Sequence, residues 1–345
     1  MHRLLFCAHN RRGLGHLMRG LNIARAISEL SPRADQRFFA RSRSAEQLCR
    51  PQFECVVDTS DNWYAGWSTM LRGFAPKVTI YDTLLPAEMP PPIGRSVYVM
   101  RRCKDDRQAT ILASAFLAGV DRIIVPHTPE EFGYELPAAL RSRSRFVGPI
   151  VRPLDPAAQL CLRARYGLSA DEAPLVSTAG GAGFGDDATT FFAVVAEAHR
   201  QLLARGTAQR HIVVRGPHYA GDLPELPGMT VVDHEPELGN LLAIASLVIA
   251  QGGYNTVNEL RLARTPAIFL PGERSYDDQA ARARALEACG AAAVFSDRTP
   301  ATVAPEIAAI ANDPARLAAM RRAYGPALES GNRAAAAAIV ELVEG

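Results

Sequence analysis

The sequence predicts an α/β protein of two domains, each built on a parallel β-sheet. Three observations predict this class. The chain has 345 residues, which is more than one typical domain holds. Short apolar runs alternate with helix-like segments in both halves, the pattern of βαβ units. Pro149 and Pro153, within residues 148–153, block helix on both sides and suggest a linker. The predicted domains are therefore 1–150 and 151–345.

The first half contains seven candidate strands, with helical segments between several of them and the clearest helix at 17–30. The candidate strands are 3–9, 36–40, 53–57, 78–82, 96–100, 122–125 and 145–147.

The second half repeats the alternation, and its Ala-rich tail after Asp313 also predicts helix. Its candidate strands are 174–178, 211–215, 230–233, 247–250, 267–270 and 291–295.

Composition narrows the class of function. Hydrophobic residues make up 48% of the chain and the net charge is +2, so no strong field favours nucleic acid or an acidic membrane. Six scattered cysteines without a C-x-x-C pair predict reduced thiols, neither a disulfide frame nor a zinc site. No apolar run approaches the ~20 residues of a membrane-spanning helix, and 1–8 is too short for a signal peptide. We expect a cytoplasmic enzyme with no transmembrane segment.

The most informative segment follows the apolar run 247–250. Gly252 and Gly253 turn the chain and leave its backbone open to a ligand. Asn255 and Thr256 can cap the next helix, whose first N–H groups then form an anion site.

Glu259 is expected in the first turn of that helix. A carboxylate there suits a vicinal diol, whose two hydroxyls can donate to its two oxygens. An anion site beside a diol site is typical of a nucleotide. Further along, residues 265–271 form a strand closed by proline at each end, and Asp278-Gln279 precede a helix expected from Ala280.

These residues resemble the donor-binding half of the GT-B glycosyltransferases, most closely the MurG type and the plant-type UDP-glycosyltransferases. The family pattern is roughly Gly-Gly-x-Asn-Ser/Thr-x-x-Glu, a Pro-bounded strand, then Asp-Gln. The resemblance implies two Rossmann-like domains that face each other across a cleft, an N-terminal acceptor domain and a C-terminal donor domain. It also implies that the last helix can pack back on the first domain.

The resemblance also implies roles for individual residues. The diphosphate would bind Gly252, Gly253, Asn255 and Thr256, the ribose Glu259, and the sugar Asp278 and Gln279. Two positions depart from the pattern. Gln251 stands where the plant-type motif has His, so its amide can donate to phosphate but brings no charge. Arg282 stands where relatives often carry Asn.

The first half contributes a histidine motif after its first strand. Residues 10–19 include Gly15 and His16 at the start of the predicted helix, at the carboxyl end of the sheet where ligands bind. A helix N-terminus disfavours the imidazolium, which suits a general base for an acceptor hydroxyl. The pattern Gly-x-Gly-His-x-x-Arg resembles the N-terminal loop of several GT-B enzymes. The resemblance implies that the glycines, among them Gly15 as a donor-binding residue, approach the diphosphate or the acceptor, and that His16 is a catalytic candidate at the predicted cleft. The alternative is a helix-capping histidine without chemistry.

Asp82 ends a predicted strand and could orient His16 or share a proton with it. The alternative is that it caps the turn before Pro86.

Two further loops are candidates for donor binding. Gly181 lies in the glycine-rich stretch 179–185, which resembles the first cleft-facing loop of the donor domain. The stretch does not fit Gly-x-Gly-x-x-Gly, so a dinucleotide oxidoreductase is a weak alternative. His234 begins a segment that resembles the family's Trp-x-Pro-Gln, which supports the nucleotide base; the alternative is an ordinary loop histidine.

Both tryptophans lie in segment 61–67, which fits an acceptor lid and a packed helix equally well.

We therefore expect a glycosyltransferase that moves a sugar from a nucleotide diphosphate sugar, by resemblance a UDP-sugar, to a hydroxyl acceptor. No cofactor or metal is expected, because no paired acids have Asp-x-Asp spacing. A nucleotide-sugar hydrolase and a non-catalytic nucleotide-sugar binding protein are the alternatives. The sugar, the acceptor, the stereochemical course and the oligomeric state stay open.

Overall fold

The protein forms two compact units in a computed structural model that describes residues 2–9, 13–83, 92–207 and 209–344. Unit 1 comprises Met1–Val151 and Glu329–Gly345, and unit 2 comprises Arg152–Leu328. The chain therefore leaves the first unit beside the expected linker and returns to it at the C-terminus. The expected second domain ran to residue 345 with a last helix able to pack back on the first domain, and the structure places Glu329–Gly345 with unit 1.

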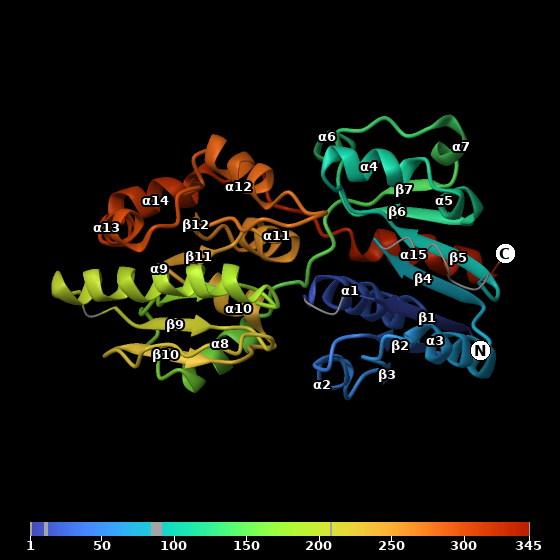
Figure 1. Ribbon diagram of the computed structural model, residues 1–345, viewed down its shortest axis with the longest axis horizontal. Helices are drawn as coiled ribbons and strands as arrows, with labels where there is room; N and C mark the ends of the chain where they lie inside the picture. Colours follow the sequence, from blue (N-terminus) through green and yellow to red (C-terminus); the bar gives the residue numbers. More distant parts are fainter. Residues whose placement is uncertain (1, 10–12, 84–91, 208, 345) are drawn as a thin grey trace. The chain divides into compact units, whose positions relative to one another are not determined.

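Unit 1 is built on a seven-stranded parallel sheet in the order β3-β2-β1-β4-β5-β6-β7 (Figure 1). Its strands are β1 (Arg3–Ala8), β2 (Asp35–Ala40), β3 (Glu54–Val57), β4 (Val78–Asp82), β5 (Arg95–Val99), β6 (Arg122–Val125) and β7 (Ser144–Phe146).

Helices cover both faces of this sheet, as buried parallel strands require. One face packs against α1 (Gly15–Leu30), α2 (Ala45–Cys49) and the C-terminal α15 (Asn332–Glu344). The other packs against α3 (Trp63–Phe74), α4 (Asp105–Leu112), α5 (Ala115–Gly119), α6 (Pro129–Phe132) and α7 (Ala138–Arg141). Asn332 fastens the start of α15 by accepting from the Val151 N–H and donating to its carbonyl.

Unit 2 has a six-stranded parallel sheet in the order β10-β9-β8-β11-β12-β13 (Figure 1). Its strands are β8 (Leu175–Thr178), β9 (His211–Val214), β10 (Met229–Val232), β11 (Leu247–Ala250), β12 (Ala267–Phe269) and β13 (Ala292–Val294). One face packs against α9 (Gly185–Ala204), α13 (Pro300–Ala311) and α14 (Pro314–Ala323). The other packs against α8 (Pro156–Arg165), α10 (Leu238–Ala243), α11 (Tyr254–Ala263) and α12 (Gln279–Ala288).

Every predicted strand is present, displaced by at most one residue at either end, and the two-domain α/β class is confirmed. In each unit the chain order of the strands reverses at one point, between β1 and β4 and between β8 and β11. Ligands of such sheets bind outside the carboxyl ends of the strands at this point. Asp82 ends β4, and His16, Gly181 and Gly252 follow β1, β8 and β11. No helix in the described part of the chain is long and apolar enough to cross a membrane.

Candidate functional site

His16 is the second residue of α1 and lies at the switch point of unit 1. The helix begins at Gly15, where an added Cβ would meet nothing within 4 Å. Packing within the described part of the protein therefore does not require glycine there. The start of the loop, residues 10–12, lies outside the described residues.

The hydrogen bonds of His16 identify its tautomer. Nδ1 lies 2.9 Å from the carbonyl oxygen of Asp82 and 3.2 Å from its Oδ1. Both oxygens accept, so Nδ1 carries a proton, and in the neutral ring the lone pair is on Nε2. The described residues offer Nε2 no hydrogen-bond partner, and the side chain is 18% exposed. The imidazole is thus held as an available proton acceptor.

The Asp82 carboxylate is bound mainly by Arg19, one helical turn beyond His16. Arg19 Nε donates to Oδ2 at 2.7 Å, Arg19 Nη2 pairs with Oδ1, and Thr83 Oγ1 donates to Oδ1 at 2.9 Å. Arg19 is only 1% exposed. Sequence reasoning quoted Arg19 in the motif without a role, although its i+3 spacing from His16 places both on one helix face.

Asp82 stays ionised beside His16. Its burial alone would raise the pKa of the carboxyl, but the charges of Arg19 and His16 and their hydrogen bonds hold that pKa well below its usual range. An ionised carboxylate next to Nδ1 orients the ring, and it would favour the imidazolium if Nε2 took a proton. The alternative role of Asp82, capping the turn before Pro86, falls on residues outside those described.

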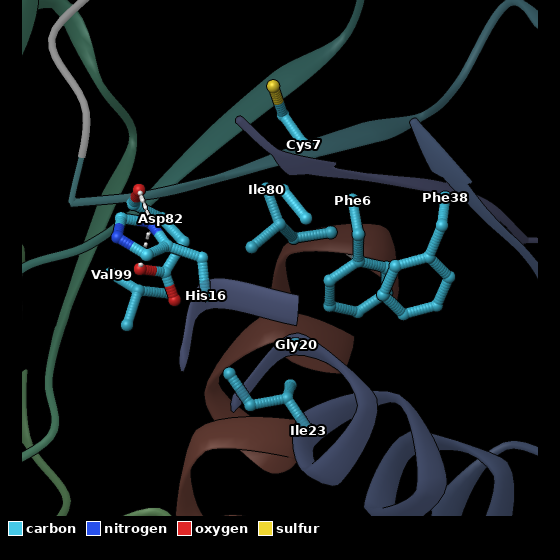
Figure 2. Close-up of a pocket in the computed structure, with 10 residues that line it drawn as sticks. Phe6, Cys7, His16, Gly20, Ile23, Phe38, Ile80, Asp82 and Val99 are labelled. Carbon is cyan, nitrogen blue, oxygen red and sulfur yellow. Dashed lines mark hydrogen bonds and ion pairs between the residues drawn. The ribbon is translucent and has the colours of Figure 1, made fainter. Parts of the chain in front are cut away.

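A small cavity of about 10 Å³ lies beneath this cluster. Figure 2 shows His16, Asp82 and Val99 at one end and Phe6, Phe38 and Ile80 along the wall, above α1. The volume is about that of one water position, so the cavity cannot hold a sugar. A substrate would have to approach the exposed edge of His16.

Both tryptophans belong to the packed helix α3. The side chain of Trp67 is buried, whereas that of Trp63 is partly exposed. Trp67 is fully buried in α3 against Phe39 and Tyr81, so it is unavailable as a lid. Trp63 is half-buried, with its ring against His9.

The glycine turn of unit 2 has a backbone conformation that favours glycine at position 252. Gly252 has φ +87°, and an added Cβ would lie 3.2 Å from the carbonyl oxygen of Gln279. Arg282 Nη1 donates to the Gly252 carbonyl at 2.9 Å and Nη2 pairs with Asp277 at 2.6 Å. Arg282, a departure from the family pattern, thus stabilises the turn.

Two local expectations for α11 were wrong. Gly253 is the N-cap, and the helix begins at Tyr254, so Asn255 and Thr256 lie within the first turn and do not cap it. Glu259 consequently lies in the second turn. The reason is that Gly253 already has extended backbone, with φ −61° and ψ 153°, and a Cβ there would touch nothing within 4 Å. Because Gly253 has no side chain, it does not cover the backbone N–H groups that follow it.

Glu259 is half-buried and makes no hydrogen bond or ion pair with any described residue. Its side chain packs over Gly239 of α10, where an added Cβ would lie 3.5 Å from Glu259 Cγ. Burial raises the pKa of Glu259 to about 7, and the charge of Arg152 opposes the shift. A buried carboxyl without partners destabilises a fold, so the arrangement favours a ligand that donates to it.

Gln251 is committed to a polar cluster. It is 4% exposed, its Nε2 donates to Asp187 Oδ2 at 2.8 Å, and its Oε1 accepts from Arg274 at 2.9 Å. Asp187 also pairs with Arg298. Sequence reasoning missed all three charged residues, because they follow three different strands.

Asp278 and Gln279 also make bonds within the protein. Asp278 caps α12 by accepting from the Ala281 N–H at 2.9 Å, and Gln279 is the first residue of the helix rather than Ala280. Gln279 Oε1 accepts from the Gly272 N–H at 3.0 Å and its side chain is buried. Both residues shape the loop after β12.

The remaining donor candidates flank the sheet edge. Gly181 lies between two residues with positive φ, Gly180 and Ala182, and its carbonyl accepts from the His218 N–H at 3.3 Å. His234 is half-buried after β10, and the described residues give its buried Nε2 no partner. Burial lowers the pKa of His234, against the charge of Glu235, so the ring is neutral near pH 7.

No group of three His, Cys, Asp or Glu side chains among the described residues is placed to hold a metal ion.

Comparison with known proteins supports the family and the fold. Residues 186–339 match the model of the glycosyltransferase family 28 C-terminal domain. Two similar proteins, both called UDP-N-acetylglucosamine--N-acetylmuramyl-(pentapeptide) pyrophosphoryl-undecaprenol N-acetylglucosamine transferase, come from Clavibacter michiganensis subsp. michiganensis and Methylobacterium nodulans. The first is 30% identical over 59% of this chain and 55% of that protein. The second is 30% identical over 79% of this chain and 77% of that protein.

The chain spans about half the length of the first curated relatives it matches, 55%, 47% and 46% of them. Solved structures share the fold over nearly all of it. MurG of Acinetobacter baumannii has a TM-score of 0.57 at 15% identity, covering 99% of this chain and 100% of that one. The glycosyltransferase VinC in complex with dTDP has 0.59 at 18% identity, covering 99% of each. By its similarity over most of the Methylobacterium relative and its GT-B architecture, this chain belongs to the MurG-like glycosyltransferases of family 28.

Proposed function

We propose that this chain transfers a sugar from a nucleoside diphosphate sugar to a hydroxyl acceptor. The observation that carries the proposal is the Glu259 carboxyl, half-buried in the second turn of α11 and without a hydrogen-bond or ion-pair partner among the described residues. A ribose diol would donate two hydrogen bonds to it, while the diphosphate would accept from the N–H groups after Gly253.

We assign separate groups to the diphosphate and to the nucleotide base of the donor. Asn255 and Thr256 lie in the first turn of α11, within the reach of the proposed diphosphate. His234 would stack on the nucleotide base, since its ring is neutral and half-buried. The names of the curated relatives specify a UDP-sugar and one fold relative was solved with dTDP, so uridine nucleotides are the first donors to test.

His16 is the proposed general base. Its free Nε2 would take the proton of the acceptor hydroxyl as that oxygen attacks the anomeric carbon, and Asp82 would stabilise the imidazolium. The leaving diphosphate would be stabilised by helix N–H groups rather than by a cation, so a chelator should leave turnover unchanged.

Calorimetry of the chain with UDP, dTDP and GDP, followed by the sugars of the nucleotide that binds, tests the donor site. Binding of one nucleotide with a dissociation constant in the micromolar range supports it. Failure of all three to bind contradicts the proposal.

Incubation of the preferred nucleotide sugar without an acceptor tests the type of reaction. Slow release of nucleotide that accelerates when hydroxyl acceptors are added supports transfer. Fast, acceptor-independent release of free sugar would identify hydrolysis instead.

A further inference from the structure

The arginine cluster of unit 2 has one more positive than negative charge. We define the cluster as Asp187, Arg274, Arg298 and Gln251. Its four residues follow four different strands, β8, β12, β13 and β11, at the carboxyl edge of one sheet. Asp187 Oδ2 lies 2.8 Å from Arg274 Nη1, and Oδ1 lies 2.6 Å from Arg298 Nη2. One carboxylate thus serves two guanidinium groups.

The surplus charge is partly shielded from water. The side chains of Arg274 and Arg298 are 10% and 18% exposed. The neighbouring acid Asp277 is occupied by Arg282, and Gln251 contributes an amide without charge. Each guanidinium shares the single Asp187 carboxylate with the other. A partly desolvated cation that is incompletely neutralised attracts an anion more strongly than a fully solvated cation does.

Arg298 has a donor to spare. Its Nη1 is buried and meets no acceptor among the described residues, whereas Nη2 is bound to Asp187. Arg274 is held in place, with its guanidinium 4.2 Å from the centroid of the Phe184 ring. A planar guanidinium matches the two oxygens of a carboxylate and binds them better than an ammonium group does.

The cluster adjoins the loop that the family resemblance assigns to the sugar. An added Cβ at Gly272 would lie 2.7 Å from Arg274 Nη1, so Gly272 permits the close approach of that guanidinium. The Gly272 N–H in turn binds Gln279. The surplus charge therefore lies next to the sugar loop, and through Gln251 it also borders the glycine turn proposed for the diphosphate.

We propose that the arginine cluster binds a carboxylate on the transferred sugar, which makes the donor a nucleoside diphosphate uronic acid. This proposal rests on the proposed transferase function and names its donor class. Arg298 supplies the unused donor, Arg274 supplies the second charge, and Asp187 keeps both guanidinium groups in position.

Calorimetry of the full chain with UDP, UDP-glucose and UDP-glucuronate tests the assignment. UDP-glucuronate should bind at least about tenfold more tightly than UDP-glucose, in line with a charge-assisted pair. Arg298→Gln should remove this advantage and leave the affinity for UDP unchanged. The exposed Arg284 of α12 provides the matched control, since Arg284→Gln should preserve the advantage.

Three outcomes separate the assignments. Equal affinity of the wild-type chain for the two sugars overturns the carboxylate site while the transferase proposal stands, and this result needs no variant. An equal loss of UDP, UDP-glucose and UDP-glucuronate in a folded Arg298→Gln variant assigns the cluster to the diphosphate and also overturns it. Absence of binding by UDP, dTDP and GDP, and by their sugars, overturns the transferase proposal itself.

Discussion

The two switch points of this protein use charge in opposite ways. In unit 1, the Asp82 carboxylate is bound by Arg19, Thr83 and His16, and the group without a partner among the described residues is Nε2 of His16. In unit 2, the Glu259 carboxyl has no partner among the described residues and its pKa is raised to about 7. The carboxyl edge of the sheet in unit 1 thus presents a positioned imidazole. The corresponding edge in unit 2 presents a hydrogen-bond acceptor that has no donor among the described residues.

The difference indicates how the two sites divide the proposed reaction. A group that is already satisfied keeps its geometry without a substrate, which suits a proton acceptor. An unsatisfied buried carboxyl gains its hydrogen bonds only from a ligand, which suits binding. Substitution of His16 should therefore affect mainly turnover, and substitution of Glu259 mainly binding.

His16→Ala should have the largest effect. Removing a general base typically lowers the rate by about 10²- to 10⁴-fold, and we expect kcat to fall within that range. Donor affinity should stay within about twofold, since the proposed donor groups belong to the other unit. Steady-state kinetics and calorimetry measure the two quantities, and a parallel loss of both would assign His16 to binding.

Asp82→Ala should destabilise unit 1. It leaves the buried Arg19 without its carboxylate, so the free energy of unfolding should fall by about 3–5 kcal/mol. Glu46→Ala is the control, because it breaks the exposed Glu46–Arg50 pair and should cost at most about 1 kcal/mol. Urea denaturation followed by circular dichroism measures both. Similar small losses would show that the Arg19–Asp82 pair contributes no more than a surface pair.

Glu259→Ala should weaken donor binding and leave unit 1 unaffected. Hydrogen bonds to a charged acceptor contribute about 1.5–3 kcal/mol, so the affinity for the donor should fall by roughly ten- to a hundredfold. The exposed Glu306 of α13 provides the control, as Glu306→Ala should leave the affinity unchanged. Calorimetry with UDP decides; full affinity in the Glu259 variant would remove the ribose assignment.

Donor binding should depend on pH through Glu259, with the smallest effect of the four. Because its pKa in the free protein is about 7, the carboxylate that accepts from the diol is mostly present at pH 8 and mostly protonated at pH 6. Affinity should therefore fall by up to about tenfold from pH 8 to pH 6. Calorimetry at the two pH values measures this dependence, which should disappear in Glu259→Gln; its survival there would assign it to another group.

The same carboxyl has the opposite effect on folding. Its pKa is raised above the unfolded value of 4.5, so its contribution to stability is present below pH 4.5 and is lost as the pH rises through 7.

The sequence by itself determined the fold class, the strands and the family. Alternating apolar runs predict parallel strands because both faces of such a sheet are buried, and the strand boundaries came within one residue. The residues Gly252, Gly253 and Glu259 carried the family resemblance, because these local motifs are contiguous in the chain. The helix starts were less accurate, since the extended backbone of Gly253 displaced Asn255 from the cap.

Only the tertiary structure decided which of those residues are available to a ligand. Gln251, Asp278 and Gln279 read as ligand contacts in sequence, yet each makes hydrogen bonds within the protein. The ion pair of Arg19 with Asp82 and the arginine cluster join residues from separate strands and helices. The physical reason is that a side chain's free hydrogen-bonding capacity depends on neighbours distant in the chain, and a local motif contains no information about them.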